Sequence, residues 1–301
     1  ILPLLTHPAD KNKIRIYWTQ PSRGFAYAGL GSVLQYKQKD VQNANDIKEQ
    51  ILDSMRMGVS LGDNSLIGPR MIGGFAFNQY KGSDSTWKHF PRIQFHIPEC
   101  LATLTDDGAW LTISRLIHPE NMTENSNEDF KRTISCYENR LPITLPPISQ
   151  IDVDKYRDVP ERDAYNQTIF SVLSQIKPGK MEKVVISRSH HVKVGKDFKV
   201  VSAIQVLRSA YPKCISFCYS FPGEGIFFGS TPERLVRLNN GFVQTEALAG
   251  TIGRGKNMEE DRILAESLLD SHKEREEHSL VLEQILRKLN STISNIQYPA
   301  T

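Results

Sequence analysis

The 301-residue chain contains little cysteine, no long apolar run and almost no excess of charge. Its four cysteines form no CxxC pair and have no neighbours at metal-ligand spacing, so a cysteine-based metal site is not expected. A net charge of +3 gives no reason to expect nucleic acid or a membrane surface as partner. No apolar run approaches the length of a membrane span, and no secretory signal pattern opens the chain. We therefore expect a reducing, cytoplasmic compartment.

Several segments of the sequence have the pattern of β-strands. Residues 14–37 and 71–77 alternate or run apolar with glycines and aromatics, and residues 92–114 predict two strands around an Asp-Gly turn at Asp107 and Gly108. The run "CISFCYSF" (214–221) is strand-like, and its two cysteines are interpreted as small buried hydrophobic residues. Strands mixed with separate helices favour an α+β fold with a large antiparallel component.

Helical periodicity is present in both halves of the chain. It predicts helices at residues 41–58, 159–176 and 257–269, and a last helix that starts at Ser271, where Ser-His-Lys-Glu makes a capping box. The polar residues 118–132 are predicted to form a loop. The Pro-rich residues 141–149 are predicted to connect two halves of one domain, residues 1–150 and 151–301.

One acidic side chain is hard to explain as surface. Glu233 follows "TP" at the start of an apolar run, and the small-residue stretch "LAGT" lies downstream. Asn240 and Gly241 form a strong hairpin turn, and pairing outward from it sets Leu238 opposite Val243 and Glu233 opposite Leu248. Continued further, that register sets Thr231 opposite Gly250. We therefore expect an acid beside a small-residue backbone surface, with Gly250 open to a ligand and Thr251 supplying a hydroxyl.

Two further carboxylates share one side of the last helix. Glu277 lies three and four residues before Leu280 and Val281, and Glu274 lies one turn earlier on that face. Carboxylates aimed inward need a cation or donors, and such a pair suits Mg²⁺. The alternative is a helix charged on all sides, whose pairs four residues apart satisfy one another at the surface.

Three other positions carry side chains that could take part in chemistry. Lys183 opens the strand-like run "KVVISRS", where a lysine is usually solvated. His190 and His191 are adjacent, and neighbours on a strand face opposite sides, so they are poor joint ligands. Arg254 in "GRG" is interpreted equally as an anion contact or as a member of a structural ion pair.

Four segments in order resemble the chorismate-utilising enzymes, most closely the isochorismate synthases. They are "KVVISR" (183–188), "FGSTPERLVRL" (228–238), "TEALAGTIGRG" (245–255) and "SHKEREEH" (271–278). The resemblance implies a sandwich-like core of large antiparallel sheets with helices packed outside. It also implies that a further C-terminal segment, with another metal carboxylate and a substrate-binding Arg and Tyr, follows in the family's pattern. We therefore expect the site to be incomplete at Thr301.

The same resemblance implies a reaction and its residues. Lys183 would take a proton from water, which attacks C2 of chorismate, and Glu233 would protonate the departing C4 hydroxyl. Mg²⁺, held by Glu277 and Glu274, would bind the ring carboxylate. Gly250 and Thr251 would hydrogen-bond substrate oxygens. The expected partner is chorismate, with neither nucleic acid nor membrane, and the expected state is a monomer or homodimer.

Three alternatives stay open on these residues. Salicylate synthases keep the lysine but usually read "GFSPEL" where this chain reads "GSTPERL". A truncated, inactive homologue that acts as a binding protein is the second. A subunit that receives ammonia from a glutaminase is the third, and Lys183 argues against it because ammonia users typically lack that lysine.

Overall fold

The computed structural model describes residues 1–6, 12–38, 66–77, 87, 90–116, 126–139, 148, 153–176, 184–195, 198–239 and 241–298. The chain forms two compact units, Ile1–Ser230 and Thr231–Thr301. The helix expected at residues 41–58 lies outside the described residues, as does most of the connector expected at 141–149. The domain boundary expected at residue 150 falls there too and stays a prediction.

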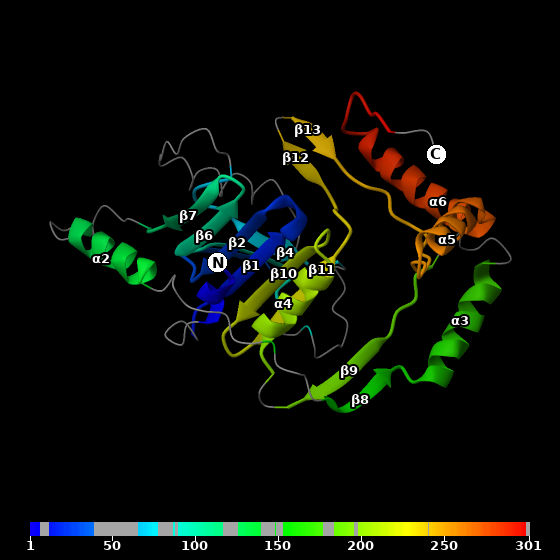
Figure 1. Ribbon diagram of the computed structural model, residues 1–301, viewed down its shortest axis with the longest axis horizontal. Coiled ribbons are helices and arrows are strands. Elements are labelled where there is room, and N and C mark those ends of the chain that lie inside the picture. Colours follow the sequence, from blue (N-terminus) through cyan, green and yellow to red (C-terminus); the bar gives the residue numbers. More distant parts are fainter. Residues whose placement is uncertain are drawn as a thin grey trace. The chain divides into compact units, whose positions relative to one another are not determined.

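A six-stranded sheet is the centre of the first unit (Figure 1). The pairings of β1 with β2 and β10, of β2 with β6 and of β6 with β7 are antiparallel. The strands in spatial order are β11 (Gly225–Thr231), β10 (Ile215–Phe221), β1 (Arg15–Gln20), β2 (Phe25–Leu30), β6 (Cys100–Thr105) and β7 (Gly108–Ile113). The α+β class with large antiparallel sheets, expected from the sequence, is confirmed.

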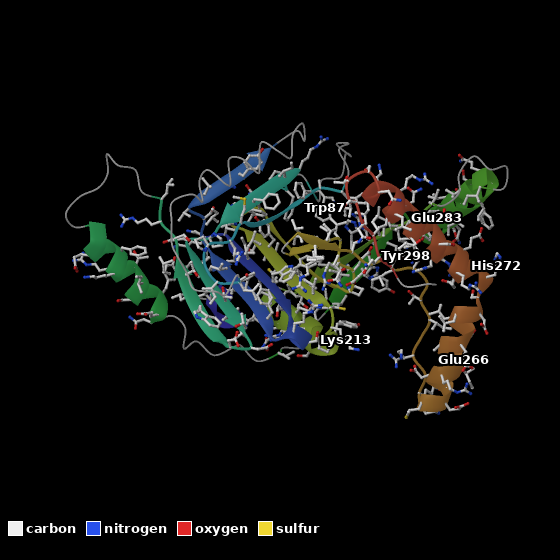
Figure 2. All side chains as sticks on the ribbon, turned by 90° about the horizontal axis from the view of Figure 1, so that it is seen from above. Trp87, Lys213, Glu266, His272, Glu283 and Tyr298 are labelled. Atoms are coloured by element: carbon white, nitrogen blue, oxygen red, sulfur yellow. The ribbon has the colours of Figure 1, made fainter. Side chains whose placement is uncertain are left out.

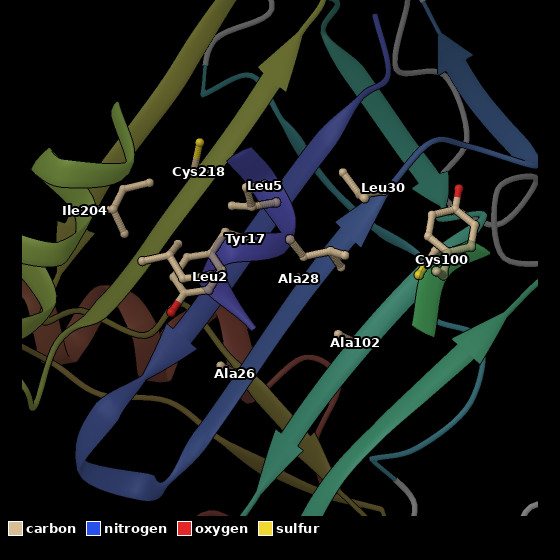
Figure 3. Packing of buried hydrophobic residues seen from close by; sticks show 12 residues of the cluster. Leu2, Leu5, Tyr17, Ala26, Ala28, Leu30, Cys100, Ala102, Ile204 and Cys218 are labelled. Carbon is tan, nitrogen blue, oxygen red and sulfur yellow. The ribbon is translucent and has the colours of Figure 1, made fainter. Parts of the chain in front are cut away.

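One face of this sheet carries the main hydrophobic core (Figure 3). Alternate residues of β2, namely Ala26, Ala28 and Leu30, lie on this face together with Cys100 and Ala102 of β6. The 3-10 helix η1 (Leu2–Thr6) and the helix α4 (Val200–Ala210) cover it, and Ile204 of α4 is fully buried. Helices outside the sheet were expected, although α4 itself was not predicted.

A second sheet packs on the opposite face. It has the order β3 (Leu34–Gln38), β5 (Ile93–Ile97), β4 (Ile72–Phe75), all antiparallel. His96 of β5 is buried, and its ring centroid lies 5.8 Å from that of Tyr219 and 6.0 Å from that of Phe221, both on β10. Desolvation lowers the pKa of His96 to about 4, so this ring is neutral in the sandwich near pH 7.

The described part of the first unit also contains a two-stranded sheet and two further helices. The strand β8 (Val153–Val159) pairs antiparallel with β9 (Ser189–Val194), and α3 (Arg162–Ile176) follows β8. The helix predicted at residues 159–176 is therefore confirmed to within three residues at its start. The helix α2 (Ser126–Glu138) occupies part of the stretch predicted as loop, so that prediction was wrong for residues 126–132.

Tyr137 anchors the helix α2 in the core. Its side chain is 2% exposed in the core, and its hydroxyl accepts a hydrogen bond from Lys13 Nζ at 2.8 Å. The same ammonium bonds Glu99 Oε2 at 2.8 Å. Phe130 and Ile134, four residues apart, share the less exposed side of α2 with Tyr137. An apolar stripe at helical spacing was therefore present in the sequence, and the loop prediction for residues 118–132 overlooked it.

The predicted Asp-Gly turn was displaced by one residue. The ladder between β6 and β7 sets Thr105 opposite Gly108, so the two turn residues are Asp106 and Asp107. Gly108 is instead the first residue of β7, with φ +148°, which favours glycine. Residues 92–114 contain three strands, β5, β6 and β7, rather than two.

The second unit contains a short hairpin and two helices. The strands β12 (Arg237–Asn239) and β13 (Phe242–Gln244) pair antiparallel, and α5 (Met258–Asp270) and α6 (His272–Leu289) follow. Both helix starts predicted from the sequence are confirmed, with Asn257 and Ser271 as N-caps. Among the described residues, no helix is both long and apolar enough to span a membrane.

All four cysteines are free thiols. Cys218 is buried, as predicted, and burial raises the pKa of its thiol to about 12. Cys214 of the same run is only half-buried.

Candidate active site

The hairpin that leads into the candidate site has the predicted register. Leu238 pairs with Val243, and Arg237 pairs with Gln244. The ladder then stops, so the continued backbone pairing that set Glu233 opposite Leu248 and Thr231 opposite Gly250 was wrong. The physical reason lies in the sequence, since Thr231 belongs to β11 and Pro232 has no N–H to donate to a ladder.

On the side of Arg237 away from the turn, side-chain hydrogen bonds take the place of backbone pairing. Thr245 Oγ1 donates to the Leu235 carbonyl at 2.7 Å, and Arg234 NH1 donates to Glu246 Oε1 at 3.1 Å. The Arg234 side chain is only 13% exposed, so this ion pair is better shielded than a surface pair. The two segments of the hairpin therefore stay in contact as far as residues 234 and 246.

Glu233, the predicted proton donor, is exposed in the described part of the chain. Its backbone N–H donates to Thr231 Oγ1 at 3.2 Å, which turns the chain at Pro232. Glu233 lies two residues after the end of β11, so the strand end and the rigid Pro232 restrict where its backbone begins. Its carboxylate is available to a ligand, and its catalytic role stays a prediction.

The segment with Gly250 lies directly against α6. A Cβ built on Gly250 would lie 3.1 Å from Glu274 Oε2 and 3.5 Å from Leu268 Cδ1. One turn further along α6, His278 Nε2 is 3.2 Å from the Ala247 carbonyl oxygen, a contact in which the ring N–H donates. Gly250 has φ +82°, a conformation that favours glycine. The structure thus brings the predicted substrate-binding glycine beside a predicted metal ligand.

The two sides of α6 differ as the sequence analysis expected. Glu274, Glu277 and His278 are half-buried on the side of Val281, whereas the side of Glu276 is exposed. The exposed residues His272 and Glu283 can be located in Figure 2. Ser271 caps the helix by accepting a bond from the Glu274 N–H at 3.4 Å. The Glu274 carboxylate lies 3.4 Å from Nζ of its neighbour Lys273, and His272 Nδ1 lies 3.9 Å from Glu276 Oε2, a contact with the four-residue spacing of the alternative interpretation.

These residues are chemically suited to Mg²⁺. Glu274 and Glu277 offer hard oxygen donors from adjacent turns, and Mg²⁺ is often held by one or two carboxylates together with waters and substrate oxygens. Within the described ranges, no group of three or more His, Cys, Asp or Glu side chains could hold a metal. Two carboxylates can hold such an ion when water and ligand oxygens complete its shell, and Mg²⁺ at this position stays a prediction.

Lys183, the predicted base, lies outside the described residues. The strand predicted for "KVVISRS" begins only at Ser189, and residues 184–188 have no regular structure, so that prediction was wrong for the described part of the run. Arg188 NH1 bonds Asp158 Oδ2 at 3.0 Å, and its guanidinium lies 5.3 Å from the centroid of the Tyr165 ring. The chain that follows Lys183 is therefore fixed to β8 and α3.

The two histidines of β9 do not act together. His190 pairs with Asp158, and its Nδ1 lies 2.6 Å from Asp158 Oδ1. His191 pairs with Arg157 and so lies on the other face of the strand. The choice left open for Arg254 is also decided, since its guanidinium makes a bidentate ion pair with Asp261.

Sequence reasoning missed His278 and Asp261. His278 lies four residues after Glu274 on the same helix face, a spacing that could have indicated contact with the same segment. Asp261 lies in the first turn of α5, where an acidic residue is ordinarily explained by the helix dipole alone. Its link to Arg254 depends on the path of the preceding loop, which no local pattern specifies.

Two curated relatives match nearly all of this chain. One is the isochorismate synthase MenF of Bacillus subtilis (strain 168), 27% identical over 95% of this chain and 61% of the relative. The other is the salicylate biosynthesis isochorismate synthase of Pseudomonas aeruginosa, 27% identical over 96% of this chain and 59% of the relative. The chain thus spans about three fifths of the length of these relatives.

The fold has a counterpart among solved structures. The menaquinone-specific isochorismate synthase MenF from Escherichia coli superposes with a TM-score of 0.72 at 21% identity, over 96% of this chain and 60% of that one. In addition, the family described as chorismate binding enzyme matches residues 1–301. Because that match runs over the entire sequence, the chain belongs to the chorismate binding enzyme family.

Proposed function

We propose that this chain carries the catalytic residues of an isochorismate synthase, which converts chorismate to isochorismate with Mg²⁺. The observation that carries the proposal is the contact between the segment of Gly250 and the carboxylate side of α6. The names of the two curated relatives agree with this activity and support it. Because the chain spans about three fifths of their length, the activity is proposed for the whole polypeptide to which these residues belong.

The proposed reaction exchanges one hydroxyl for another without a net change in composition. Lys183 takes a proton from water as the water oxygen bonds to C2 of chorismate. The ring double bonds shift, the C4–O bond breaks, and Glu233 gives its proton to the departing hydroxyl, which leaves as water. A base and an acid on opposite sides of the transferred groups avoid both a free hydroxide and a free alkoxide.

The second unit would hold the substrate during this exchange. The Gly250 backbone, which has no side chain to block approach, and the Thr251 hydroxyl would donate hydrogen bonds to substrate oxygens. Glu277 and Glu274 would hold Mg²⁺, which would neutralise the ring carboxylate and the charge that develops as the double bonds move. His278 would keep the Ala247 carbonyl, and with it this segment, against α6.

The test is turnover of chorismate by the full polypeptide with identification of the product. We expect isochorismate with Mg²⁺ present, none after chelation, and recovery when Mg²⁺ is restored. Formation of salicylate and pyruvate would instead identify a salicylate synthase. A requirement for ammonium, with a nitrogen-containing product, would identify an ammonia user. Binding of chorismate without turnover would support the inactive homologue.

Replacement of Lys183 tests the base directly. Lys183→Ala is expected to lower kcat by about a hundredfold to ten-thousandfold, the usual contribution of a general base. Lys193→Ala, which removes an exposed lysine from β9, is the matched control and should leave the rate unchanged. Undiminished turnover by Lys183→Ala would refute the assigned role.

We further propose that the protein works in the cytoplasm as a monomer or homodimer. The four free cysteines agree with a reducing compartment. Chorismate is the proposed partner, and a small, doubly negative ligand needs no extended basic surface to bind.

A further inference from the structure

The segment of residues 245–255 is held at its start, in its middle and at its end. At the start, Thr245 Oγ1 bonds the Leu235 carbonyl at 2.7 Å. In the middle, His278 holds the Ala247 carbonyl. At the end, Asp261 holds both Arg254 and Gly255. The two residues proposed to touch substrate lie between the second and third of these contacts.

Three hydrogen bonds make up the contact at Asp261, in which the Arg254 side chain is 87% exposed. Asp261 Oδ1 accepts from Arg254 Nε at 2.6 Å and from the Gly255 N–H at 2.8 Å, and Oδ2 accepts from Arg254 NH2. Charge-assisted, bidentate hydrogen bonds of this kind fix direction as well as distance. The bond from Arg254, followed by that from the Gly255 N–H, holds the pKa of the Asp261 carboxyl below its ordinary value.

The backbone around this contact leaves little room for another path. A Cβ on Gly255 would lie 2.1 Å from Asp261 N, so only glycine fits there. The Lys256 N–H donates to Glu260 Oε2 at 2.7 Å, and the Glu260 N–H donates to the cap Asn257 at 2.9 Å. The loop from Arg254 to the start of α5 is therefore bound to the helix that follows it at each step.

A second ion pair on α5 has similar chemistry, but its partners all lie within the helix. Arg262 bonds both oxygens of Glu259, at 3.2 and 2.7 Å, and also bonds Glu266. All three residues belong to α5, so this pair holds no residue outside the helix. The Asp261 pair differs because it joins the helix to the segment that carries Gly250 and Thr251.

We propose that Asp261 is a positioning residue: through Arg254 and Gly255 it sets where Gly250 and Thr251 present their donors to the substrate. The inference rests on the proposed function and goes beyond it, since Asp261 itself does not touch chorismate. Donors that hold substrate and transition state alike act on KM more than on kcat. The loss of this contact should therefore appear chiefly as weaker binding.

The experiment compares Asp261→Asn and Arg254→Lys with the control Glu259→Gln in the full polypeptide. Arg254→Lys keeps the charge but loses the planar bidentate fork, so it provides a second route if Asp261→Asn folds poorly. For both Asp261→Asn and Arg254→Lys we expect the KM for chorismate to rise about tenfold and kcat to fall less than about threefold. Hydrogen exchange of the amides of residues 250–256 should become faster in both and stay unchanged in Glu259→Gln.

Each outcome decides the inference. The inference is supported if Asp261→Asn and Arg254→Lys, but not Glu259→Gln, show both a raised KM and faster hydrogen exchange of residues 250–256. Faster exchange with unchanged KM makes the contact merely structural and overturns it, as does unchanged exchange. A wild-type protein that does not turn over chorismate refutes the proposed function instead. The exchange of residues 250–256 then still decides whether Asp261 holds the segment.

Discussion

The six-stranded sheet and the second unit are stabilised in different ways. Among the described residues, every buried side chain lies between Leu2 and Phe221, and none lies in residues 231–298. The sheet has an apolar core sealed by η1 and α4, whereas α5 and α6 have no buried residue. The segment of Gly250 is instead held by hydrogen bonds and ion pairs to neighbouring elements.

This difference separates residues that maintain the fold from residues proposed for chemistry. Half-buried carboxylates such as Glu274 and Glu277 keep water and donors within reach, which a metal or a small anion requires. A fully apolar core could not hold such charges without a large desolvation cost. Substitutions in the second unit should therefore change activity more than stability, and substitutions in the sheet core should do the reverse.

The largest effect on activity is expected from Glu277→Gln. Loss of a proposed metal ligand should lower kcat/KM by at least about a hundredfold, because a bound cation contributes several kcal/mol to stabilising charge in the transition state. The melting temperature should change little, since Glu277 is not part of a core. Enzyme kinetics and thermal unfolding, each with and without Mg²⁺, measure both quantities.

Glu276→Gln is the matched control for that prediction. Its carboxylate is exposed on the other side of the same turn of α6. Equal activity of both variants, or a loss in Glu276→Gln alone, would contradict the assignment of the metal to the Glu277 side.

Leu30→Ala should have the largest effect on stability. Leu30 is fully buried in β2 opposite Cys100, and removing its side chain leaves a cavity in the core. The expected loss is about 2–5 kcal/mol in the free energy of unfolding. Leu269→Ala on α5, where the side chain is 70% exposed, should cost less than about 0.5 kcal/mol. Urea denaturation compares the two, and similar losses would show that the second unit has a core of its own.

Local sequence patterns predicted the elements whose causes are local. The Asn-Gly signal in the sequence predicted the register that β12 and β13 have, and the capping residues Asn257 and Ser271 predicted the starts of α5 and α6. They failed where a distant partner decides. The strand β8 is largely polar and forms because it pairs with β9. The helix α2 was missed for a different reason, since the spacing of Phe130, Ile134 and Tyr137 is a local helical signal that was overlooked.

The candidate site was predictable to a similar extent. The common face of Glu274 and Glu277 follows from helical spacing, and the structure retains it. The contact of Gly250 with Glu274 does not follow from spacing, because it depends on how residues 245–255 turn between β13 and α5. Arg234, Asp261 and His278 guide that turn, and each acts on a residue at least seven positions away.

Gly250→Ala should have an intermediate effect on the second unit. The φ of +82° disfavours a side chain by about 1–2 kcal/mol, and the new Cβ would lie 3.1 Å from Glu274 Oε2. We expect a lower melting temperature and weaker Mg²⁺ binding. Both are measured by recording thermal unfolding at a series of Mg²⁺ concentrations. Gly253→Ala is the control, because a Cβ there meets no atom within 4 Å. If both variants bind Mg²⁺ like the wild type, the proximity of Gly250 to the metal ligands has no functional meaning.

The smallest effect tests whether polar contacts also contribute in the first unit. The hydrogen bond from His190, followed by the Arg188 charge, lowers the pKa of Asp158. A lowered folded-state pKa means that the contact stabilises the protein above the ordinary carboxyl value of about 4, and that this stability is lost as pH falls through the folded-state value. Asp158→Asn should therefore melt slightly below the wild type at neutral pH, with the difference vanishing toward pH 3. Asp107→Asn, at an exposed turn, should show no such trend. A difference in melting temperature that persists at low pH would mean that Asp158 acts by packing rather than by charge. The hairpin of β8 and β9 would then be stabilised by packing, as the six-stranded sheet is, rather than by polar contacts, as the second unit is.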